Sequence, residues 1–361
     1  MAVYPRRHRN ALLLLNAIVA AAATSPSPAE FVKSMGIGIN LGNVLDAPYE
    51  ASWAKPAKER YFDDYHSAGF KSVRVPVRWD HHTLTASPWT VNSTFLDRVE
   101  EVVGWSISRG LRTIVNTHHD DWLDGAADDD AFTVQLQRLT AIWAQIAERF
   151  KSHPDHLLAF EVYNEPHFNM TVDWLNRMNT AVLPVIRATN PRRNVLFGGL
   201  KFMNPNWITS NPDAMAFPAD DDHVFLEVHS YDPYSFCGMT AGSITHTWSK
   251  STIDGWADKV AAWASQRNIS VLLGEFGVNN TQTNTTGRVA WYTYVRETVE
   301  AKGFAATVWD DSGQFAIYDR DAGTWDTDVL RALGLNSSAV GGFSAAPLPP
   351  SKGLPQLEWQ P

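Results

Sequence analysis

A strand-like run that ends in a polar Asn-Glu pair occupies residues 158–167, Leu158-Ala159-Phe160-Glu161-Val162-Tyr163-Asn164-Glu165-Pro166-His167. The proline ends the strand because it has no N–H to donate to a neighbouring strand. A carboxylate at the end of a buried strand is costly for stability but well placed for chemistry. In a purely structural alternative, Glu165 caps the helix that follows. The pattern on either side of this run weighs against that alternative.

A short β-rich run, a polar loop and an amphipathic helical stretch recur along the chain. The strand candidates are 36–40, 72–77, 112–117, 157–163, 195–199, 224–229, 271–275 and 305–309. The helical candidates are 57–69, 95–110, 132–150, 172–189, 248–267 and 286–303. Several of them end in a glycine, such as Gly69, Gly110 and Gly303, as the C-terminus of a helix often does.

Eight strands that alternate with helices over about 300 residues predict a single-domain α/β fold, a (β/α)8 TIM barrel. The competing fold is an open doubly wound sheet, which usually has a glycine-rich phosphate turn after its first strand. Gly36 and Gly38 could supply two glycines of such a turn, but Leu41 stands where the third is required. The sequence therefore favours the barrel.

Active sites of this fold collect at the C-terminal ends of the strands. Six of the eight predicted strands end in ionisable, hydrogen-bonding or aromatic side chains, which a barrel built only for stability does not need. These ends are Arg74 with Arg78-Trp79, Asn116 to Asp120, Asn164-Glu165, His229 to Tyr231, Gly274 to Gly277 and Val308 to Asp310.

Two glutamates at these ends, Glu165 and Glu275, indicate glycosidic bond cleavage. One carboxyl group must protonate the leaving oxygen, and the other must stay ionised, either to attack the sugar or to activate water. Their surroundings must therefore separate their pKa values. Arg74 and Tyr231 are candidates to hold one glutamate as a carboxylate, and His229 is a candidate to keep the other a proton donor.

Two other chemistries are weaker alternatives. The run His118-His119-Asp120 suggests a metal site, but adjacent strand residues point to opposite faces, so we expect that the two histidines do not share one ion. A serine triad lacks the Gly-x-Ser-x-Gly turn. We therefore expect no metal and no cofactor.

Seven motifs together resemble glycoside hydrolase family 5, the cellulase family of retaining (β/α)8 hydrolases. The resemblance covers about Gly36 to Leu333. The motifs are Gly-Ile-Asn-Leu-Gly-Asn at 38–43, Val-Arg-Val-Pro-Val-Arg-Trp at 73–79, Asn-Thr-His-His at 116–119, Asn-Glu-Pro at 164–166, His-Ser-Tyr at 229–231, Gly-Glu-Phe-Gly at 274–277 and Trp-Asp at 309–310.

The resemblance implies a role for each matching residue. Glu165 would be the general acid/base and Glu275 the nucleophile of a double displacement that retains configuration. Asn164 would hold the sugar 2-hydroxyl. The remaining implied substrate-binding or orienting residues are Asn43, Asp46, Arg74, His118, His119, His229, Tyr231 and Trp309.

Within the family, the Leu-Gly-Asn-Val-Leu-Asp-Ala-Pro segment at 41–48 looks like the endo-β-1,4-glucanase branch. The hypothesis is a secreted endo-β-1,4-glycanase acting on cellulose or mixed β-glucan. The alternatives are a β-mannanase, or an enzyme with both activities, and a catalytically inactive glycan-binding barrel. The inactive barrel is disfavoured because binding alone needs neither glutamate.

Composition limits the partners of the chain. It has 361 residues, is 44% hydrophobic and carries a net charge of -9, so it lacks the basic stripe that nucleic acid binding requires. Its 15 Trp suit a cleft that stacks on sugar rings, although any one of them is as easily a core residue. We expect a monomer with a β-linked polysaccharide as its partner, and no membrane association once the leader is removed.

The N-terminus predicts a signal peptide at 1–25. Arg6, Arg7 and Arg9 precede an apolar run of about 13 residues, which is short of the roughly 20 needed to span a bilayer. The expected division is therefore leader 1–25, catalytic domain 26–344 and proline-rich tail 345–361, with a secreted product. The sequons at Asn92, Asn169, Asn268, Asn279, Asn284 and Asn336 permit glycosylation if the source is eukaryotic. No glycan is expected at Asn169, because it lies close to Glu165.

Overall fold

The computed structural model describes residues 25–238, 245, 247–280, 285–338 and 341–343. The predicted leader and the proline-rich tail lie outside these residues, apart from Ser25. Within them, eight parallel strands pair in sequence order and close into a barrel, so the predicted fold is confirmed. The strands are β1 (Ile37–Asn40), β2 (Ser72–Val75), β3 (Arg112–Asn116), β4 (Leu158–Glu161), β5 (Val195–Gly198), β6 (Val224–His229), β7 (Val271–Phe276) and β8 (Ala305–Val308).

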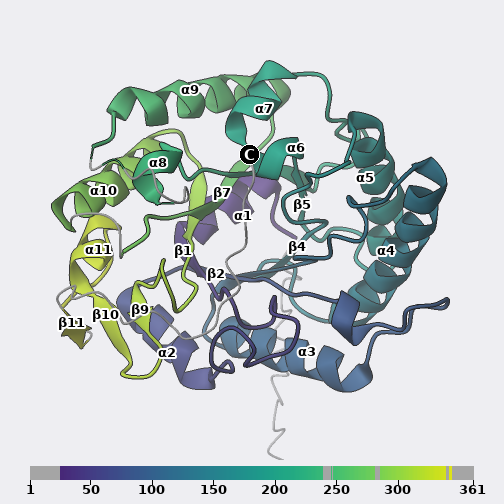
Figure 1. Ribbon diagram of the computed structural model, residues 1–361, viewed down its shortest axis with the longest axis horizontal. Coiled ribbons are helices and arrows are strands. Elements are labelled where there is room, and N and C mark those ends of the chain that lie inside the picture. The colour runs from purple at the N-terminus through teal and green to yellow at the C-terminus, as the bar shows by residue number, and fades with distance from the viewer. Residues whose placement is uncertain (1–24, 239–244, 246, 281–284, 339–340, 344–361) are drawn as a thin grey trace, which may run out of the picture.

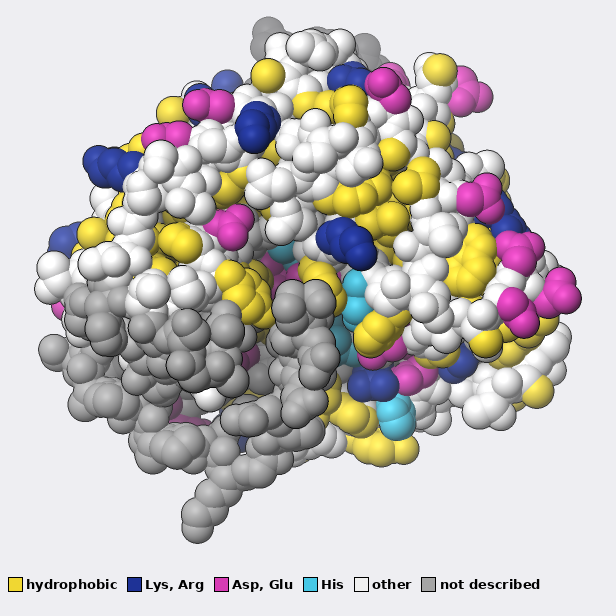
Figure 2. Space-filling view, turned by 45° about the horizontal axis from the view of Figure 1, so that its top comes forward, with side chains coloured by type: hydrophobic (Ala, Val, Ile, Leu, Met, Phe, Trp, Pro, Cys, Tyr) yellow, Lys and Arg dark blue, Asp and Glu magenta, His cyan; other side chains and the backbone are white. Residues whose placement is uncertain are grey.

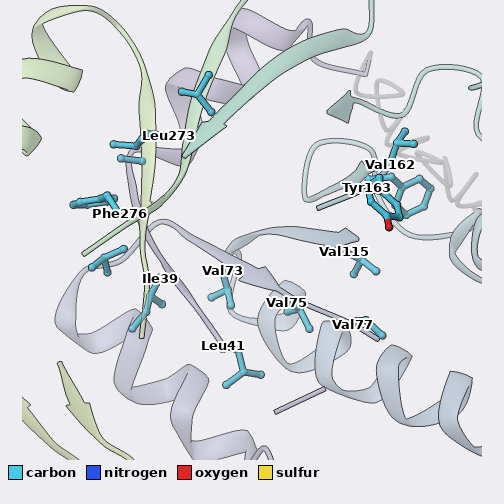
Figure 3. Packing of buried hydrophobic residues seen from close by; sticks show 14 of the residues in the cluster. Ile39, Leu41, Val73, Val75, Val77, Val115, Val162, Tyr163, Leu273 and Phe276 are labelled. Atoms are coloured by element: carbon cyan, nitrogen blue, oxygen red, sulfur yellow. The ribbon is translucent and has the colours of Figure 1, made fainter. Parts of the chain in front are cut away.

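Helices form a ring around the barrel (Figure 1). The long helices are α2 (Glu59–Ala68), α3 (Ser93–Ser108), α4 (Asp129–Phe150), α5 (Val172–Arg187), α9 (Lys250–Arg267) and α10 (Thr285–Ala301). They correspond to the six predicted helices within a few residues at each end. Their apolar faces pack on the outward side chains of the strands, such as Ile39, Val73, Val75 and Leu273 (Figure 3).

Several short elements were not predicted, because two to eight residues carry too little periodicity to be recognised. They are α1 (Pro28–Met35), η1 (Asp80–His82), α6 (Leu200–Met203), α7 (Pro205–Ser210), α8 (Tyr234–Cys237), α11 (Thr327–Ala332), β9 (Tyr318–Asp319), β10 (Thr324–Asp326) and β11 (Gly342–Phe343). The last three strands form a small separate sheet.

Helix α1 closes the N-terminal end of the barrel. Its start is fixed by a capping box, in which Ser27 and Glu30 satisfy each other's backbone N–H groups. Its apolar face, Phe31, Val32 and Met35, is buried in one cluster with inward side chains from six strands. Those side chains are Ile114, Ala159, Leu196, Phe225, Leu272 and Ala305. The bottom of the barrel interior is therefore an apolar layer sealed by a helix.

The next inward layer is polar. Side chains two residues apart on a strand share a face, so the positions above the apolar layer are the next inward ones. We call six buried side chains at this level the polar floor: Asn40, Arg74, Asn116, Glu161, Glu227 and Thr307. Gly198 and Gly274 occupy the corresponding positions of β5 and β7. The polar floor separates the apolar bottom from the C-terminal ends of the strands.

The structure corrects the expectation for one sequon. Asn279 is fully buried, and its amide donates to Gln314 Oε1 at 3.1 Å, so the folded protein cannot carry a glycan there. Asn284 lies outside the described residues. None of the helices in the described part of the chain is both long and apolar enough to cross a membrane.

Candidate active site

Both predicted catalytic glutamates lie at the C-terminal end of the barrel, where β4 and β7 end. Figure 2 shows histidine and acidic side chains gathered there. A carboxylate oxygen of Glu165, one of Glu275 and a ring nitrogen of His229 all lie within 4.8 Å of one another. The glutamates are 6% and 5% exposed, so each is largely shielded but still reaches the surface. The barrel thus brings together two acids that are far apart in sequence.

Glu275 accepts hydrogen bonds from two side chains. Arg74 Nη1 donates to Oε1 at 2.8 Å, and the Tyr231 hydroxyl donates to Oε2 at 2.9 Å. These are the partners that the sequence suggested for the ionised acid. A guanidinium and a phenol on opposite oxygens hold the carboxylate in one orientation, as a nucleophile requires.

Glu165 has a different partner. Strand β4 ends at Glu161, and Glu165 follows with a φ of 48°, which is unusual for a residue that is not glycine. This turn directs its Oε1 to within 2.7 Å of His229 Nδ1. A shift of register between Val228 and His229 places His229 opposite Glu275, where it lies between the two acids.

The environments of Glu165 and His229 keep a proton between the two groups. Burial, with the charge of Glu275 added, raises the pKa of Glu165 against the opposing bond from His229. Burial disfavours a charged ring at His229, but Glu275, Glu165 and Glu227 outweigh it and raise the pKa of His229 to about 10. The pair of His229 Nδ1 and Glu165 Oε1 therefore retains a proton at neutral pH, as an acid catalyst must.

Arg74 connects the polar floor to the site. It is fully buried, and its Nη2 donates to Asn164 Oδ1 at 2.7 Å. Burial alone would lower the pKa of Arg74, but Glu161, Glu227 and Glu275 raise it well above its ordinary value, so the charge is permanent. Because Arg74 occupies the oxygen of Asn164, the NH2 group of that amide is turned away from Arg74 and is available to a ligand.

His118 and Trp309 form one wall. Their rings are nearly parallel, at 6°, with centroids 6.0 Å apart. The amide of Asn116 contacts His118 Nδ1 at 3.0 Å, which leaves the proton of the neutral ring on Nε2. Burial, with the nearby His119 ring, lowers the pKa of His118 well below its ordinary value. The ring is therefore a neutral donor toward the site.

Asn43, Asp46 and His119 lie beside this wall. Both oxygens of the buried Asp46 accept backbone N–H groups, from Asn43 at 3.0 Å and Val44 at 2.8 Å. His119 Nε2 lies 3.9 Å from Asp46 Oδ2. Asp46 thus holds the loop and supports His119, and its direct contact with substrate remains a prediction.

The prediction that His118 and His119 point to opposite faces is wrong. One ligand atom each of Asp46, His118 and His119 lie within 4.8 Å of one another. Strand β3 ends at Asn116, and His119 has a φ of 55°, so the alternation of a strand no longer applies there. The two ring centroids are 4.3 Å apart.

Sequence reasoning missed the acids of the polar floor, Glu161 and Glu227. Glu161 binds Arg74 through two bonds, Nε to Oε2 at 2.7 Å and Nη2 to Oε1 at 2.8 Å. Glu227 Oε1 lies 3.2 Å from Arg74 Nε and 3.4 Å from His229 Nε2. Both were inside predicted strands, and a charged residue in an otherwise apolar strand was the signal that could have revealed them.

Substituting Gly42 should displace the Trp309 ring. A Cβ at position 42 would lie 2.8 Å from the Asp310 carbonyl oxygen and 2.8 Å from Trp309 Cζ2, closer than real contacts allow. We expect Gly42→Ala to lower kcat/KM about 10- to 100-fold, because the site tolerates little displacement. Gly255→Ala is the matched control, since its Cβ would meet nothing within 4 Å. Equal kinetics for both variants would contradict this reading.

Asp311, which follows β8, should make stability depend on pH. Burial, with the charge of Asp310 added, raises the pKa of Asp311 from 3.8 to about 6, although backbone N–H groups oppose the shift. The folded state then binds the proton more tightly than the unfolded chain, so the free energy of unfolding falls as pH rises from about 4 to about 6 and stays low above that.

Asp311→Asn should remove this effect. Asp311 Oδ1 accepts both loop bonds, from Gly313 at 2.7 Å and Phe315 at 3.0 Å, and an asparagine oxygen can take its place. We subtract the free energy of unfolding of the wild type from that of the variant at each pH. This difference should be about 1–3 kcal/mol higher at pH 8 than at pH 4. Urea unfolding at the two pH values measures this, and a difference that does not change with pH would contradict it.

Comparisons with known proteins agree with the geometry. Residues 38–314 match the model of Cellulase (glycosyl hydrolase family 5). Endoglucanase H of Acetivibrio thermocellus is 43% identical over 85% of this chain, and endoglucanase A of Ruminococcus albus is 30% identical over 84%. The endoglucanase Cel5A of Thermotoga maritima superposes with a TM-score of 0.78 at 29% identity, covering 85% of this chain and all of that one.

The relatives differ in length. The match covers 33% of endoglucanase H and 40% of the cellulase/esterase CelE from the same organism, but 91% of the Ruminococcus albus endoglucanase A. The family match spans most of the chain and includes Arg74, Glu165 and Glu275. The chain therefore belongs to glycoside hydrolase family 5, the cellulase family.

Proposed function

We propose that the protein is a retaining endo-β-1,4-glycanase that cleaves internal bonds of cellulose or mixed β-glucan. One observation carries the proposal: two carboxyl groups approach within 4.8 Å, one bonded to Arg74 and Tyr231 and the other to His229. Retaining glycosidases hold their two acids about 5–5.5 Å apart, whereas inverting enzymes leave room for a water between them. The spacing supports direct attack by Glu275.

In the first step, a Glu275 oxygen attacks the anomeric carbon while the glycosidic C–O bond breaks. The leaving oxygen takes the proton of Glu165, so Glu165 becomes a carboxylate and the sugar is held on Glu275 as an ester. Arg74 and Tyr231 orient the attacking carboxylate. The NH2 group of Asn164 donates to the sugar 2-hydroxyl, a bond that strengthens as positive charge develops on the ring.

In the second step, Glu165 accepts a proton from water, and the water oxygen replaces Glu275 on the anomeric carbon. Glu165 is thereby protonated again and Glu275 is released as a carboxylate. His229 shares the returning proton with Glu165 through its Nδ1 at 2.7 Å. His118 and Trp309 form the wall beside the sugar under attack.

Product analysis tests the reaction and the polymer together. The protein should release oligosaccharides from carboxymethylcellulose and from mixed β-glucan, with an early fall in viscosity that marks internal cleavage. NMR of the first product should show the β-anomer, because two displacements restore the configuration. An α-anomer as first product would overturn the retaining mechanism, and no sugar release from any β-linked polymer would overturn the enzyme.

A β-mannanase is the second candidate. One observation favours it: the Thermotoga maritima Cel5A has also been solved in complex with a mannotriose substrate, at a TM-score of 0.78. The same experiment with mannan and glucomannan separates the candidates. Turnover of mannan with none of cellulose would identify a mannanase, and turnover of both would identify a broad enzyme.

We also propose that the protein is secreted as a monomer after removal of residues 1–25. The basic start and the apolar run at the N-terminus support export. N-terminal sequencing of the protein recovered from culture medium tests the cleavage, and gel filtration with light scattering tests the oligomeric state. Retention of the full-length chain inside the cell would overturn the proposal of export.

A further inference from the structure

The acid Glu227 of the polar floor lies directly beneath His229. Both side chains come from β6, two residues apart on its inward face. Glu227 is fully buried, and its Oε1 lies 3.4 Å from His229 Nε2 on the far side of the ring from Glu165. Glu227, His229 and Glu165 therefore form a chain that ends at the acid proposed to protonate the leaving group.

The fold makes room for Glu227. A Cβ at Gly274, on the neighbouring strand β7, would lie 1.7 Å from Glu227 Oε1. The carboxyl group thus occupies the space that a side chain at 274 would fill. Its Oε2 is buried without a hydrogen-bond partner among the described residues, which is costly for a carboxylate. A carboxyl group buried at such a cost is a candidate for a functional role.

Neutralising Arg74 does not require Glu227. Glu161 already binds that guanidinium through both oxygens, at 2.7 and 2.8 Å, and Glu275 contacts it at 2.8 Å. Glu227 lies farther from it, with Oε1 3.2 Å from Arg74 Nε. Within the described residues, only Glu227 supplies an acceptor for His229 Nε2.

Acids outnumber cations around His229. The groups that face the ring are Arg74 from β2, His118 beyond β3, Glu161 from β4, Glu165 beyond β4, Glu227 from β6, Tyr231 beyond β6 and Glu275 from β7. Four carboxyl groups thus share one guanidinium and one imidazole. An excess of carboxylate favours keeping protons on the ring and on Glu165.

We propose that Glu227 is a positioning residue for acid/base catalysis, which holds the Nε2–H of His229 so that Nδ1 faces Glu165 and shares its proton. A histidine with one N–H fixed by a carboxylate has one tautomer and one ring orientation. Each time Glu165 gives its proton to the leaving oxygen or takes one from water, the same ring nitrogen bonds to it. This proposal rests on the function of Glu165 proposed above.

The test uses Glu227→Gln in the full-length protein and two substrates. Cellotetraose needs a proton on its leaving oxygen, whereas 2,4-dinitrophenyl β-cellobioside does not, because dinitrophenolate leaves unaided. We expect kcat/KM to fall about 10- to 100-fold for cellotetraose, part of what a general acid contributes, and by less than about threefold for the dinitrophenyl substrate. The basic limb of the cellotetraose pH profile should move down by about one unit, since a negative charge beside His229 is lost.

Glu161→Gln is the matched control. It removes an equally buried carboxylate that binds Arg74 and Asn116, so it should act through the Arg74 side of the site. Both substrates should then lose rate alike, with no selective effect on cellotetraose. Glu227→Gln could instead lower kcat/KM equally for both substrates and leave the basic limb of the cellotetraose pH profile in place. Glu227 would then be only structural, and the proposal would be wrong.

Two further measurements keep the proposal testable if Glu227→Gln folds poorly. Gly274→Ala should displace Glu227 without removing its charge, and should reproduce the selective loss on cellotetraose. In the wild type, proton NMR should show a far-downfield imidazole N–H that disappears in His229→Gln, and its absence would contradict the proposed chain. Two other results test the proposed function of Glu165 separately. The wild type should release sugar from cellotetraose, and Glu165→Ala should lose activity selectively on that substrate.

Discussion

Glu275→Ala should reduce hydrolysis of cello-oligosaccharides about 10⁴-fold or more, because no other group among the described residues of the site is placed to attack the anomeric carbon. Arg74 and Tyr231 hold the Glu275 carboxylate with bonds of 2.8 and 2.9 Å, so the loss removes a fixed nucleophile. The measurement is initial rate on cellotetraose and on dinitrophenyl β-cellobioside, and both substrates should lose activity because both need the attack.

Rescue by azide tests whether the carboxylate removed in Glu275→Ala is the nucleophile. In Glu275→Ala, azide can enter from the side of the lost carboxylate and displace the leaving group once, which gives an α-glycosyl azide. Glu297→Ala controls for removing a carboxylate, since Glu297 is 58% exposed and pairs only at the surface with Arg296, and its activity should not change. Substantial activity in Glu275→Ala without azide would show that the nucleophile lies elsewhere.

The second large effect is expected for Glu165→Ala, and it depends on the substrate. The 2.7 Å bond to His229 and the raised pKa of Glu165, caused mainly by burial, suit a proton donor. Cellotetraose turnover should fall about 10²- to 10⁴-fold, the usual contribution of general acid catalysis. With the dinitrophenyl substrate, the first step should survive and the enzyme should accumulate as a glycosyl ester, because water is no longer activated.

Azide again separates the roles of the two acids. It needs no base, so it should release the ester of Glu165→Ala and yield a β-glycosyl azide, with the opposite configuration to the product from Glu275→Ala. Equal losses on both substrates would contradict a role in protonating the leaving group. An α-azide from Glu165→Ala would mean that the two roles are reversed.

The barrel could be predicted because its signals are local. Each β-rich run and each long amphipathic helix carries its own periodicity, and parallel strands then place their C-terminal ends on one face. The pairing of Glu165 with Glu275 followed from that rule alone. The separate partners of these acids were also foreseeable, because Arg74, His229 and Tyr231 end strands.

Other features of the site could not be predicted, because they depend on backbone geometry that sequence periodicity does not indicate. The turn that places Glu165 has a φ of 48°, and the register shift before His229 sets which acid the ring meets. The polar floor was hidden for another reason. Glu161 and Glu227 lie within short strands, and only closing the barrel makes their positions inward. The contact between His118 and His119 depended on where β3 ends.

The helix that seals the barrel sets a limit on maturation. Asn194 donates to the Pro26 carbonyl at 3.0 Å, and the Ser27 side chain accepts the Glu30 N–H that begins the helix. An export protease that cut beyond Ser27 would leave Phe31 and Met35 on a frayed end and admit water to the base of the barrel. The same boundary applies to anyone trimming the gene for expression: the chain must begin at or before Pro26.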